Sequence, residues 1–261
     1  MTKIYAVVNQ KGGVGKTTSV INLSAFLASS GHKTLMVDLD PQANATSGVG
    51  LDKMSVDPST YDILLEESGI EDTIVTLPKF KLDVLPSHPD LAGAEVELVN
   101  AIGREYRLQK ALEEVNGRYE YILIDCPPSL SLLTVNALTT AKDGVLIPVQ
   151  CEYLALEGLA QLTQTVKLVQ KYLNPDIYIR GLMMTMYDSR TNLSRQVVEE
   201  VRNYFPHKVF RTIVPRNIRL SEAPSYGEPI NVYAPNSPGA IAYKVLTAEI
   251  LKGDKAKETS A

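Results

Sequence analysis

The residues with the clearest chemistry lie near the N-terminus, in the segment NQKGGVGKTT at positions 9–18. Gly15, Lys16 and Thr17 occupy the last three fixed positions of the phosphate-binding loop G-x-x-x-x-G-K-[ST], whereas Gln10 stands where that pattern has its first glycine. The additional glycines preserve the physical requirement, because glycine lets successive backbone N–H groups turn towards one anion without a clash of Cβ atoms. We therefore predict a loop that binds the phosphates of ATP or ADP together with Mg²⁺.

The polar side chains of this loop have separate expected tasks. Lys16 would neutralise the β- and γ-phosphates, Thr17 would ligate Mg²⁺, and Thr18 would contact the α-phosphate. The helix expected after the loop would add its N-terminal dipole. The alternative is a glycine-rich turn that binds nothing, which the sequence, spacing and context together disfavour. The nucleotide-binding residues that the loop pattern itself predicts are Gly12, Gly13, Val14, Gly15, Lys16, Thr17 and Thr18.

Three aspartates follow strand-like segments. Asp38 and Asp40 lie in LMVDLDPQ, and Asp125 ends the apolar run YILID. Carboxylates at the C-terminal ends of parallel strands face the ligand crevice of an α/β sheet. A hydrophobic strand that ends in aspartate, a few strands after a phosphate-binding loop, is typical of the Walker B arrangement, whose carboxylate holds Mg²⁺ directly or through water. Asp40 and Asp125 could instead cap a helix or a turn.

Strand-like and helix-like segments alternate along the chain, and they must position these residues. Short apolar runs predict strands at residues 4–8, 34–37, 82–85, 121–124, 145–149, 177–186 and 209–214. Apolar residues at helical spacing predict helices at about 17–28, 90–99, 104–115, 131–141, 154–172, 193–204 and 238–251. This alternation predicts an α/β fold, with a mostly parallel twisted sheet and helices on both faces. Residues 52–80 are the least regular and could form a surface insertion.

Length and composition favour a single domain of residues 1–252, followed by a polar, flexible tail at 253–261. The chain has 261 residues and is 44% hydrophobic and 21% charged, which is ordinary for a globular protein. Cys126 and Cys151 are too few for a disulfide framework and lack metal-ligand spacing, so we expect reduced core residues. No apolar segment is long enough for a signal-peptide core or a membrane span, and we therefore expect a cytoplasmic protein.

The segment NQKGGVGKTT resembles the deviant Walker A motif KGGxGK[ST] of the ParA/MinD family of ATPases, and DLDPQ and DCPPS resemble the motifs that follow it in that family. The resemblance implies that Lys11 reaches across a dimer interface to the nucleotide of the partner subunit. It implies that Asp40 orients or polarises the attacking water, and that Asp38 supports the magnesium site without touching the ion. The metal site would then comprise Thr17, Asp38 and Asp125, and the catalytic residues would be Lys11, Lys16 and Asp40.

The segment VPRNIRLSEAPSYGEPI at 214–230 is similar to the chromosomal (Soj) branch of the ParA family. Its proline and glycine content predicts a loop with short helices. In that branch the PRN segment closes over the adenine. The similarity therefore implies that Pro215 and Asn217 contact the base.

The charge distribution is compatible with a nucleic-acid-binding face on an acidic protein. The net charge is -4, but residues 180–219 contain eight Lys and Arg against three Asp and Glu, so the rest of the chain carries -9. By the same similarity, Arg190 in DSRTNLS and Arg219 in RNIRLSEAP bind DNA, through contacts that ignore base sequence. The alternative is a solvated charged face. Further members of this surface could be Arg195, Lys208 and Arg211.

The resemblance covers nearly the whole chain and implies a ParA-type DNA-partitioning ATPase. ATP would produce a sandwich homodimer that binds nonspecific double-stranded DNA, a ParB-type centromere-binding protein would stimulate hydrolysis, and the protein would associate with the nucleoid. Because the motif begins at Asn9, we expect no DNA-reading domain before it, as in the short chromosomal type.

Two other functions are compatible with the same scaffold. A MinD-like membrane-surface ATPase should end in a basic amphipathic helix with bulky apolar residues, whereas the chain ends in LKGDKAKETSA and no membrane partner is expected. A metabolic enzyme would need either the cysteines of a shared iron–sulfur cluster or a second substrate pocket, and the sequence identifies neither.

Overall fold

The computed structural model describes residues 2–152 and 155–259, which form one eight-stranded sheet with the order β3-β4-β2-β5-β1-β6-β7-β8. Neighbouring strands are parallel, except that β3 and β4 are antiparallel. The central strands β2 and β5 are buried along their whole length, as their continuous apolar runs require. The strands are β1 (Lys3–Val7), β2 (Thr34–Asp38), β3 (Val75–Leu77), β4 (Leu82–Leu85), β5 (Tyr121–Asp125), β6 (Val145–Gln150), β7 (Ile179–Tyr187) and β8 (Val209–Pro215).

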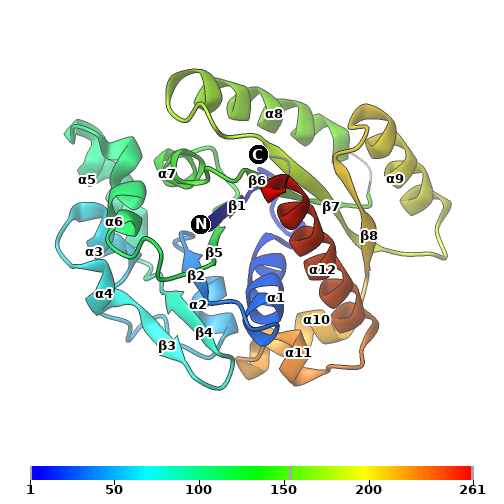
Figure 1. Ribbon diagram of the computed structural model, residues 1–261, viewed down its shortest axis with the longest axis horizontal. Helices are drawn as coiled ribbons and strands as arrows, with labels where there is room; N and C mark the ends of the chain where they lie inside the picture. The colour runs from blue at the N-terminus through cyan, green and yellow to red at the C-terminus, as the bar shows by residue number, and fades with distance from the viewer. Residues whose placement is uncertain (1, 153–154, 260–261) are drawn as a thin grey trace.

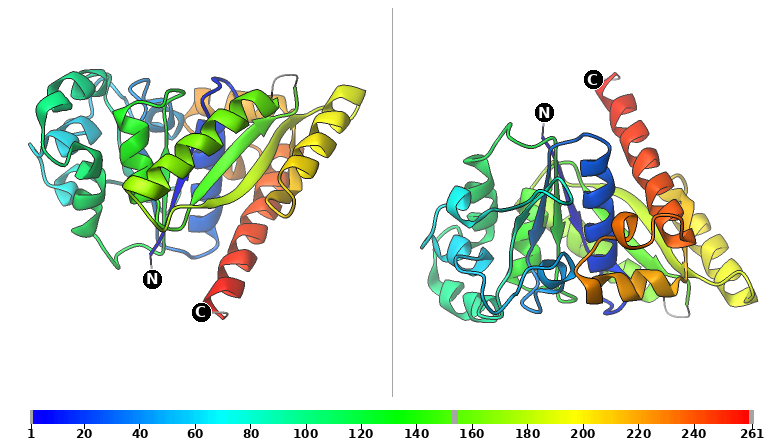
Figure 2. Two further views of the ribbon diagram at one scale, coloured as in Figure 1. Left: turned by 90° about the horizontal axis from the view of Figure 1, so that it is seen from above. Right: turned by 90° about the horizontal axis from the view of Figure 1, so that it is seen from below.

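Helices cover both faces of this sheet, as Figures 1 and 2 show. Helix α1 (Lys16–Ser29) and helix α12 (Pro238–Glu258) pack side by side on one face, around a core that includes Leu23 and Leu246. A separate core on the other face lies under α7 and α8. The remaining helices are α2 (Asn44–Gly48), α3 (Thr60–Leu65), α4 (Ile70–Thr73), α5 (Leu91–Glu97), α6 (Arg107–Glu113), α7 (Leu132–Thr140), α8 (Ala155–Tyr172), α9 (Asn192–Tyr204), α10 (Ile218–Glu222) and α11 (Ile230–Tyr233).

The predicted fold class is confirmed, and each predicted strand and long helix is present with shifts of a few residues at its ends. Residue 154, where one helix is predicted to begin, lies outside the described residues. The sequence did not predict β3, an antiparallel edge strand of only three residues that are partly exposed. It also did not predict the short helices α2, α3 and α4. Such elements carry too few residues to show a hydrophobic period.

The predicted end of the last helix at residue 251 is wrong, because α12 continues to Glu258. Asp254 explains the extension: it is only 3% exposed, pairs with Arg180 at 3.0 Å and accepts the Tyr5 hydroxyl at 2.7 Å. A buried charge that is fully paired fixes the helix end to the sheet. Residues 260–261 of the predicted tail lie outside the described residues.

Ile241, Val245, Leu246 and Ile250 recur at helical spacing in the last helix, which predicts that all four face the core. Leu246 and Ile250 are buried, but Ile241 and Val245, which the helical period places in the core, are 55% and 51% exposed. These two side chains lie on the solvent side of the helix, so its core stripe is narrower than the sequence suggests.

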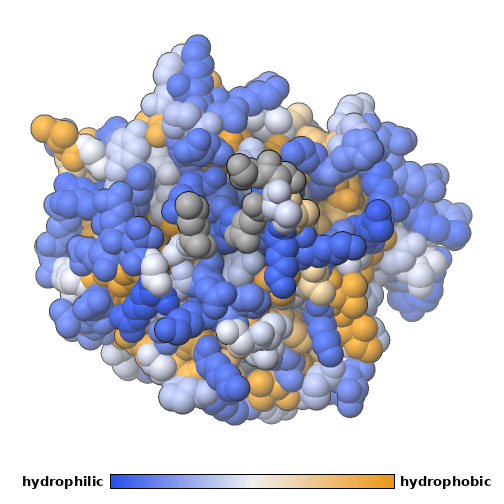
Figure 3. Space-filling view, viewed as in Figure 1, coloured by the Kyte–Doolittle hydropathy of each residue, from blue (hydrophilic) through white to orange (hydrophobic). Residues whose placement is uncertain are grey.

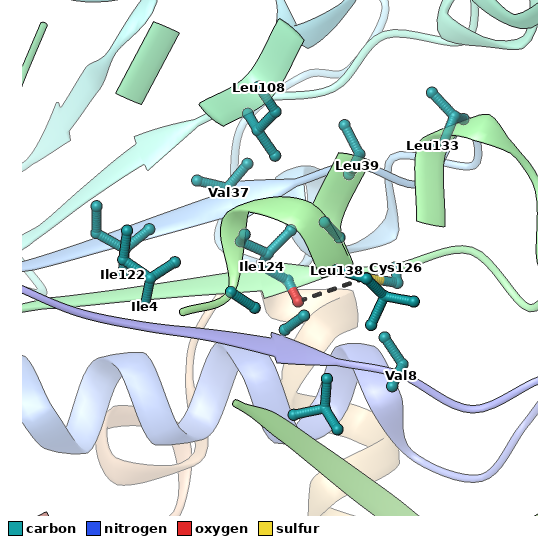
Figure 4. Packing of buried hydrophobic residues seen from close by; sticks show 14 of the residues in the cluster. Ile4, Val8, Val37, Leu39, Leu108, Ile122, Ile124, Cys126, Leu133 and Leu138 are labelled. Carbon is teal, nitrogen blue, oxygen red and sulfur yellow. Dashed lines mark hydrogen bonds between the residues drawn. The ribbon is translucent and has the colours of Figure 1, made fainter. Parts of the chain in front are cut away.

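Figure 4 shows the core around β1, β2 and β5, with Cys126 next to Val8 and Leu138. Both cysteines are buried and neither forms a disulfide, which agrees with their expected place in the core. The face shown in Figure 3 is mostly hydrophilic, and apolar residues form small separate groups on it. In the described part of the chain, no helix combines the length and the apolar character needed to cross a bilayer.

Candidate nucleotide-binding site

The phosphate loop connects the end of β1 to the start of α1, as the sequence predicts. Gly13 and Gly15 have φ angles of 73° and 89°, in the left-handed region that a residue with a Cβ adopts only at a cost. Helix α1 begins at Lys16, immediately after the second of these glycines. The backbone N–H groups of the loop and of the first helical turn therefore meet at one place, which is the arrangement that binds phosphate groups.

The two lysines of the loop have opposite surroundings. Lys16 is only 7% exposed, and its ammonium group donates to the backbone carbonyl of Lys11 at 3.2 Å. Burial lowers the pKa of Lys16, and the negative charge of Asp125 acts in the other direction. The Lys11 side chain and the two glycines after it are exposed. Lys16 therefore points into the loop, whereas Lys11 is presented to the outside.

Side chains that the sequence did not identify anchor this loop. The Asn9 side chain donates to the backbone carbonyl of Pro148 at 2.7 Å and accepts the N–H of Lys11 at 3.0 Å. The Thr185 hydroxyl donates to the carbonyl of Val14 at 2.9 Å. Pro148 is in β6 and Thr185 is in β7, far along the chain, so no local pattern in the sequence could reveal their contacts with the loop.

Asp38 and Asp125 end neighbouring strands, and their Cα atoms are partners in the register of β2 and β5. The Asp38 carboxylate accepts the hydroxyl and the N–H of Thr46, each at 2.7 Å, and the N–H of Asp40 at 3.2 Å. Burial raises the pKa of Asp38 to about 6, and the Thr46 hydrogen bonds partly oppose that shift. Asp38 is thus satisfied by protein groups, and its role in supporting the metal site stays a prediction.

Asp125 is different, because both of its carboxylate oxygens are buried and have no hydrogen-bond partner among residues 2–152 and 155–259. Burial raises the pKa of Asp125 well above its usual value, and the charge of Asp38 raises it further. The Thr17 hydroxyl, which lies beside this carboxylate without meeting the geometry of a hydrogen bond, and then the positive charge of Lys16 act in the opposite direction. A buried carboxylate without hydrogen bonds is costly, and a nearby cation would remove that cost.

These residues fit a magnesium ion that is held jointly with phosphate. The described residues contain no group of three or more His, Cys, Asp or Glu that could hold a metal by itself. Mg²⁺ usually binds through one or two protein oxygens together with waters and substrate phosphates. The Thr17 hydroxyl and the unpaired oxygens of Asp125 are suitable donors of that kind.

Asp40 lies in the turn between β2 and α2, where the sequence places it, and is 7% exposed. Its carboxylate accepts the backbone N–H of Gln42 at 2.9 Å, which is a turn-capping contact. Asp40 therefore caps its own turn and not a helix, because the N-cap of α2 is Ala43. Its role towards the attacking water stays a prediction.

A cavity of about 520 Å³ extends from the phosphate loop. Thr18 and Gly15 line the end that borders the loop, and Pro215 and Asn217 line the other part, as expected for contacts to a base. Val214 and Leu220 give it apolar walls, which suit an aromatic ring. Several lining residues were not predicted from the sequence, among them Thr185, Met186, Ser221 and Tyr243.

The arginines expected to bind DNA lie at the same end of the sheet as this cavity. Arg190 follows β7 and its side chain is 84% exposed, while Arg219 is in α10 and is 55% exposed. Each has an acidic neighbour: Arg190 contacts Asp188 at 2.6 Å, and Arg219 contacts Glu222 at 2.8 Å. Exposed pairs of this kind are weak, so phosphate groups can compete for both arginines.

The structure does not bring all the basic residues together. Arg195 is in α9, just after Arg190, but Lys208 precedes β8 and Arg211 lies near the start of that strand. At about 3.3 Å per residue, β8 places Lys208 roughly 20 Å from the opposite end of the strand. Arg219 comes after that opposite end. Arg180, included in the charge count, is only partly exposed and is paired with Asp254. The basic surface near the cavity is therefore smaller than the sequence suggests.

Comparison with known proteins relates this geometry to a family. A family model described as "AAA domain" matches residues 2–179. The chain is 58% identical to the sporulation initiation inhibitor protein Soj of Bacillus subtilis, with 96% of this chain and 98% of that protein covered. It is 53% identical to the chromosome partitioning protein ParA of Myxococcus xanthus, with 98% and 90% covered. The chain belongs to the Soj/ParA family of chromosome-partitioning ATPases. The resemblance inferred from the motifs is thereby confirmed.

Solved structures agree on the fold of the Soj/ParA chain. Cobyrinic acid a,c-diamide synthase from Mycobacterium smegmatis, described with bound ADP and magnesium, has a TM-score of 0.87 and 38% identity, with 98% of this chain and 97% of that one covered. The cell division ATPase MinD of Pyrococcus furiosus has a TM-score of 0.79 and 27% identity, with 97% and 99% covered. Because these names describe different activities, the assignment to partitioning rests on the relatives of 58% and 53% identity and not on the shared fold.

Proposed function

We propose that this chain is an ATP-driven switch for DNA partitioning. ATP and Mg²⁺ bind at the phosphate loop, two subunits close face to face over two nucleotides, and the dimer binds nonspecific double-stranded DNA. A ParB-type centromere-binding partner then stimulates hydrolysis, and the dimer separates and leaves the DNA. The protein would work in the cytoplasm, on the nucleoid, without a membrane partner.

The observation that carries this proposal is the contrast between the two lysines of the loop. Lys16 is buried and serves the nucleotide of its own subunit, so it cannot also reach another subunit. Lys11 is exposed on the same loop, next to two exposed glycines. If a second subunit approached this surface, Lys11 of the first subunit would lie close to the phosphates bound by the second. A positive charge there stabilises the transition state.

The protein groups have separate roles in hydrolysis. Lys16 binds the β- and γ-phosphates, Thr17 and Asp125 would hold Mg²⁺, and Asp38 keeps the strand end in place behind them. Bound Mg²⁺ neutralises charge on the phosphates. Asp40 accepts a hydrogen bond from the attacking water and orients it. Turnover by the ATP dimer alone is expected to be slow, because such switches depend on a partner to complete the site.

Dimerisation is tested by replacing Gly12 with valine. A Cβ at Gly12 would have no heavy atom of the described residues within 4 Å, and its φ is not in the left-handed region. The change should therefore alter the stability of the monomer by less than about 0.5 kcal/mol, but prevent the close approach of a second subunit. We expect normal ATP binding and no ATP-dependent dimer in analytical ultracentrifugation.

The matched control for this variant is Gly69→Val, because a Cβ at Gly69 would meet only the Asp72 carboxylate among the described residues, at 3.4 Å, and its φ of -75° suits valine. Gly69 precedes α4 at the β3 edge of the sheet, whereas the loop follows β1. Gly69→Val should dimerise normally. Normal ATP-dependent dimerisation of Gly12→Val would contradict the face-to-face arrangement.

The DNA surface is tested by Arg219→Glu. The change removes a phosphate contact from each subunit and introduces repulsion, so we expect roughly tenfold weaker binding to random duplex DNA. The slope of log affinity against log salt concentration should fall by the equivalent of about two phosphate contacts per dimer. Turnover without DNA should be unchanged. Lys208→Glu, the same charge reversal at the other end of β8, should bind DNA nearly as well as the wild type. An equal loss in both variants would mean that overall charge, and not this surface, determines binding.

The membrane-surface alternative makes a separate prediction. If the chain acted like a MinD-type ATPase, ATP would cause it to sediment with anionic liposomes. The exposed Ile241 and Val245 of α12 lie one helical turn apart and provide little apolar area. We therefore expect no ATP-dependent sedimentation.

A further inference from the structure

Two buried hydroxyl side chains connect the aspartates after β2 to the loop after β4. The hydroxyl of Thr46, in helix α2, donates to the Asp38 carboxylate at 2.7 Å and accepts the backbone N–H of Ser87 at 2.9 Å. Neither Thr46 nor Ser87 has any solvent exposure. Because every polar group in this chain of contacts is satisfied, the loop after β4 is held firmly against α2.

The second hydroxyl extends the connection to Asp40. The Ser87 hydroxyl donates to the backbone carbonyl of Asp40 at 2.9 Å, and the N–H of Ala43 donates to the same carbonyl at 2.8 Å. The N–H of Asp40 in turn donates to Asp38 at 3.2 Å. The backbone N–H of Asp40 is thus fixed through Asp38 and Thr46, and its backbone carbonyl is fixed through Ser87.

We propose that Thr46 and Ser87 are positioning residues for ATP hydrolysis, which hold Asp40 where its carboxylate can orient the attacking water. This inference rests on the proposed role of Asp40 and adds two residues to it. Neither side chain lines the cavity next to the phosphate loop, so neither is expected to contact the nucleotide.

The turn that carries Asp40 needs such support. Among the described residues, its carboxylate is held within the turn only by the N–H of Gln42. Ala43 has a φ of 50°, a left-handed conformation that is costly for a residue with a Cβ and persists only where surrounding contacts enforce it. Removing a contact would let the turn relax, and a displacement of about 1 Å can lower a catalytic rate by roughly 100-fold.

The test compares Thr46→Val and Ser87→Ala with Thr46→Ser, which keeps the hydroxyl. The first two should lower kcat at saturating ATP and Mg²⁺ at least about tenfold while KM for ATP changes less than about twofold, because ground-state binding does not involve Asp40. Thr46→Ser should keep kcat within about threefold of the wild type. Thr73→Val is the matched control, since Thr73 is also buried but its hydroxyl donates to the carbonyl of Gly69 at 2.9 Å, at the start of α4, and the kcat of this variant should be unchanged.

Measurement of Asp40→Ala alongside these variants distinguishes the proposed role of Asp40 from the positioning role of Thr46 and Ser87. If Asp40→Ala keeps wild-type turnover, the proposed role of Asp40 fails, and the positioning role fails with it. If Asp40→Ala is inactive but folded Thr46→Val and Ser87→Ala turn over like the wild type, only the positioning inference is overturned. Should Thr46→Val not fold, Ser87→Ala decides alone, because it leaves the bonds between Thr46 and Asp38 intact.

Discussion

Lys16→Ala is expected to abolish ATP hydrolysis and to weaken nucleotide binding strongly. The Lys16 ammonium group is buried at the start of α1 and lies over the loop, held by the carbonyl of Lys11. Removing a pre-organised charge of this kind from a phosphate site lowers kcat by at least about 100-fold. Turnover and the affinity for a fluorescent ATP analogue, both measured with Mg²⁺, test this expectation.

Lys11→Ala provides the contrast. Because the Lys11 side chain is exposed, its removal should leave nucleotide binding by the monomer within about threefold of the wild type while turnover by the dimer falls. We propose that Lys16 binds the nucleotide of its own subunit and that Lys11 contacts the nucleotide of the partner. Equal losses of nucleotide binding in the two variants would contradict this assignment.

Asp40→Ala should stop turnover and leave the ATP-bound dimer on DNA. The carboxylate is the proposed acceptor for the attacking water, and loss of such a group lowers rates by about 10²- to 10⁴-fold. The Gln42 N–H loses its partner but can bind water at the partly exposed turn, so the fold should persist. Single-turnover hydrolysis and DNA retention after the addition of ATP measure the two effects.

Asp52→Ala is the matched control for that experiment. Asp52 is an exposed aspartate in the loop after α2, where it accepts hydrogen bonds only from Met54 and Ser55 among the described residues. Its removal should change neither turnover nor DNA retention. Full ATPase activity in Asp40→Ala would show that another group acts on the water.

The sequence predicted the parts of the site that are local in the chain. A glycine-rich loop between a strand and a helix is a continuous segment, so its residues and its place at the start of α1 could be predicted from spacing. Asp38 and Asp125 could be placed together because the ends of parallel strands meet at one edge. The resemblance to ParA proteins supplied the proposed roles of Lys11, Asp40 and Pro215, which spacing does not show.

Contacts between distant segments could not be predicted in the same way. Thr185 supports Val14, although 171 positions separate them, and Ser87 reaches Asp40 from 47 positions away. A threonine or serine has no signature that identifies its partner, since its role depends on which loops the fold brings together. The extension of α12 to Glu258 has the same origin, because its anchor, Asp254, binds Arg180 of β7.

Whether the carboxylates of the site already have hydrogen-bond partners also could not be predicted from the sequence. A strand that ends in aspartate predicts a carboxylate in the crevice, but not whether its oxygens are already bonded. Asp38 is satisfied by Thr46, while Asp125 is buried without a partner in the described part of the chain. This difference indicates which of the two carboxylates is available to a cation.

The proposal that ATP controls DNA binding is tested most directly by the binding of random-sequence duplex DNA over a series of salt concentrations. Biolayer interferometry would compare the protein without nucleotide, with ADP, with ATP, and the Asp40→Ala variant with ATP. We predict binding only with ATP, lost steeply as salt rises and longest-lived in Asp40→Ala. Equal binding in all nucleotide states, or none in any, would contradict the account of an ATP-dependent DNA switch.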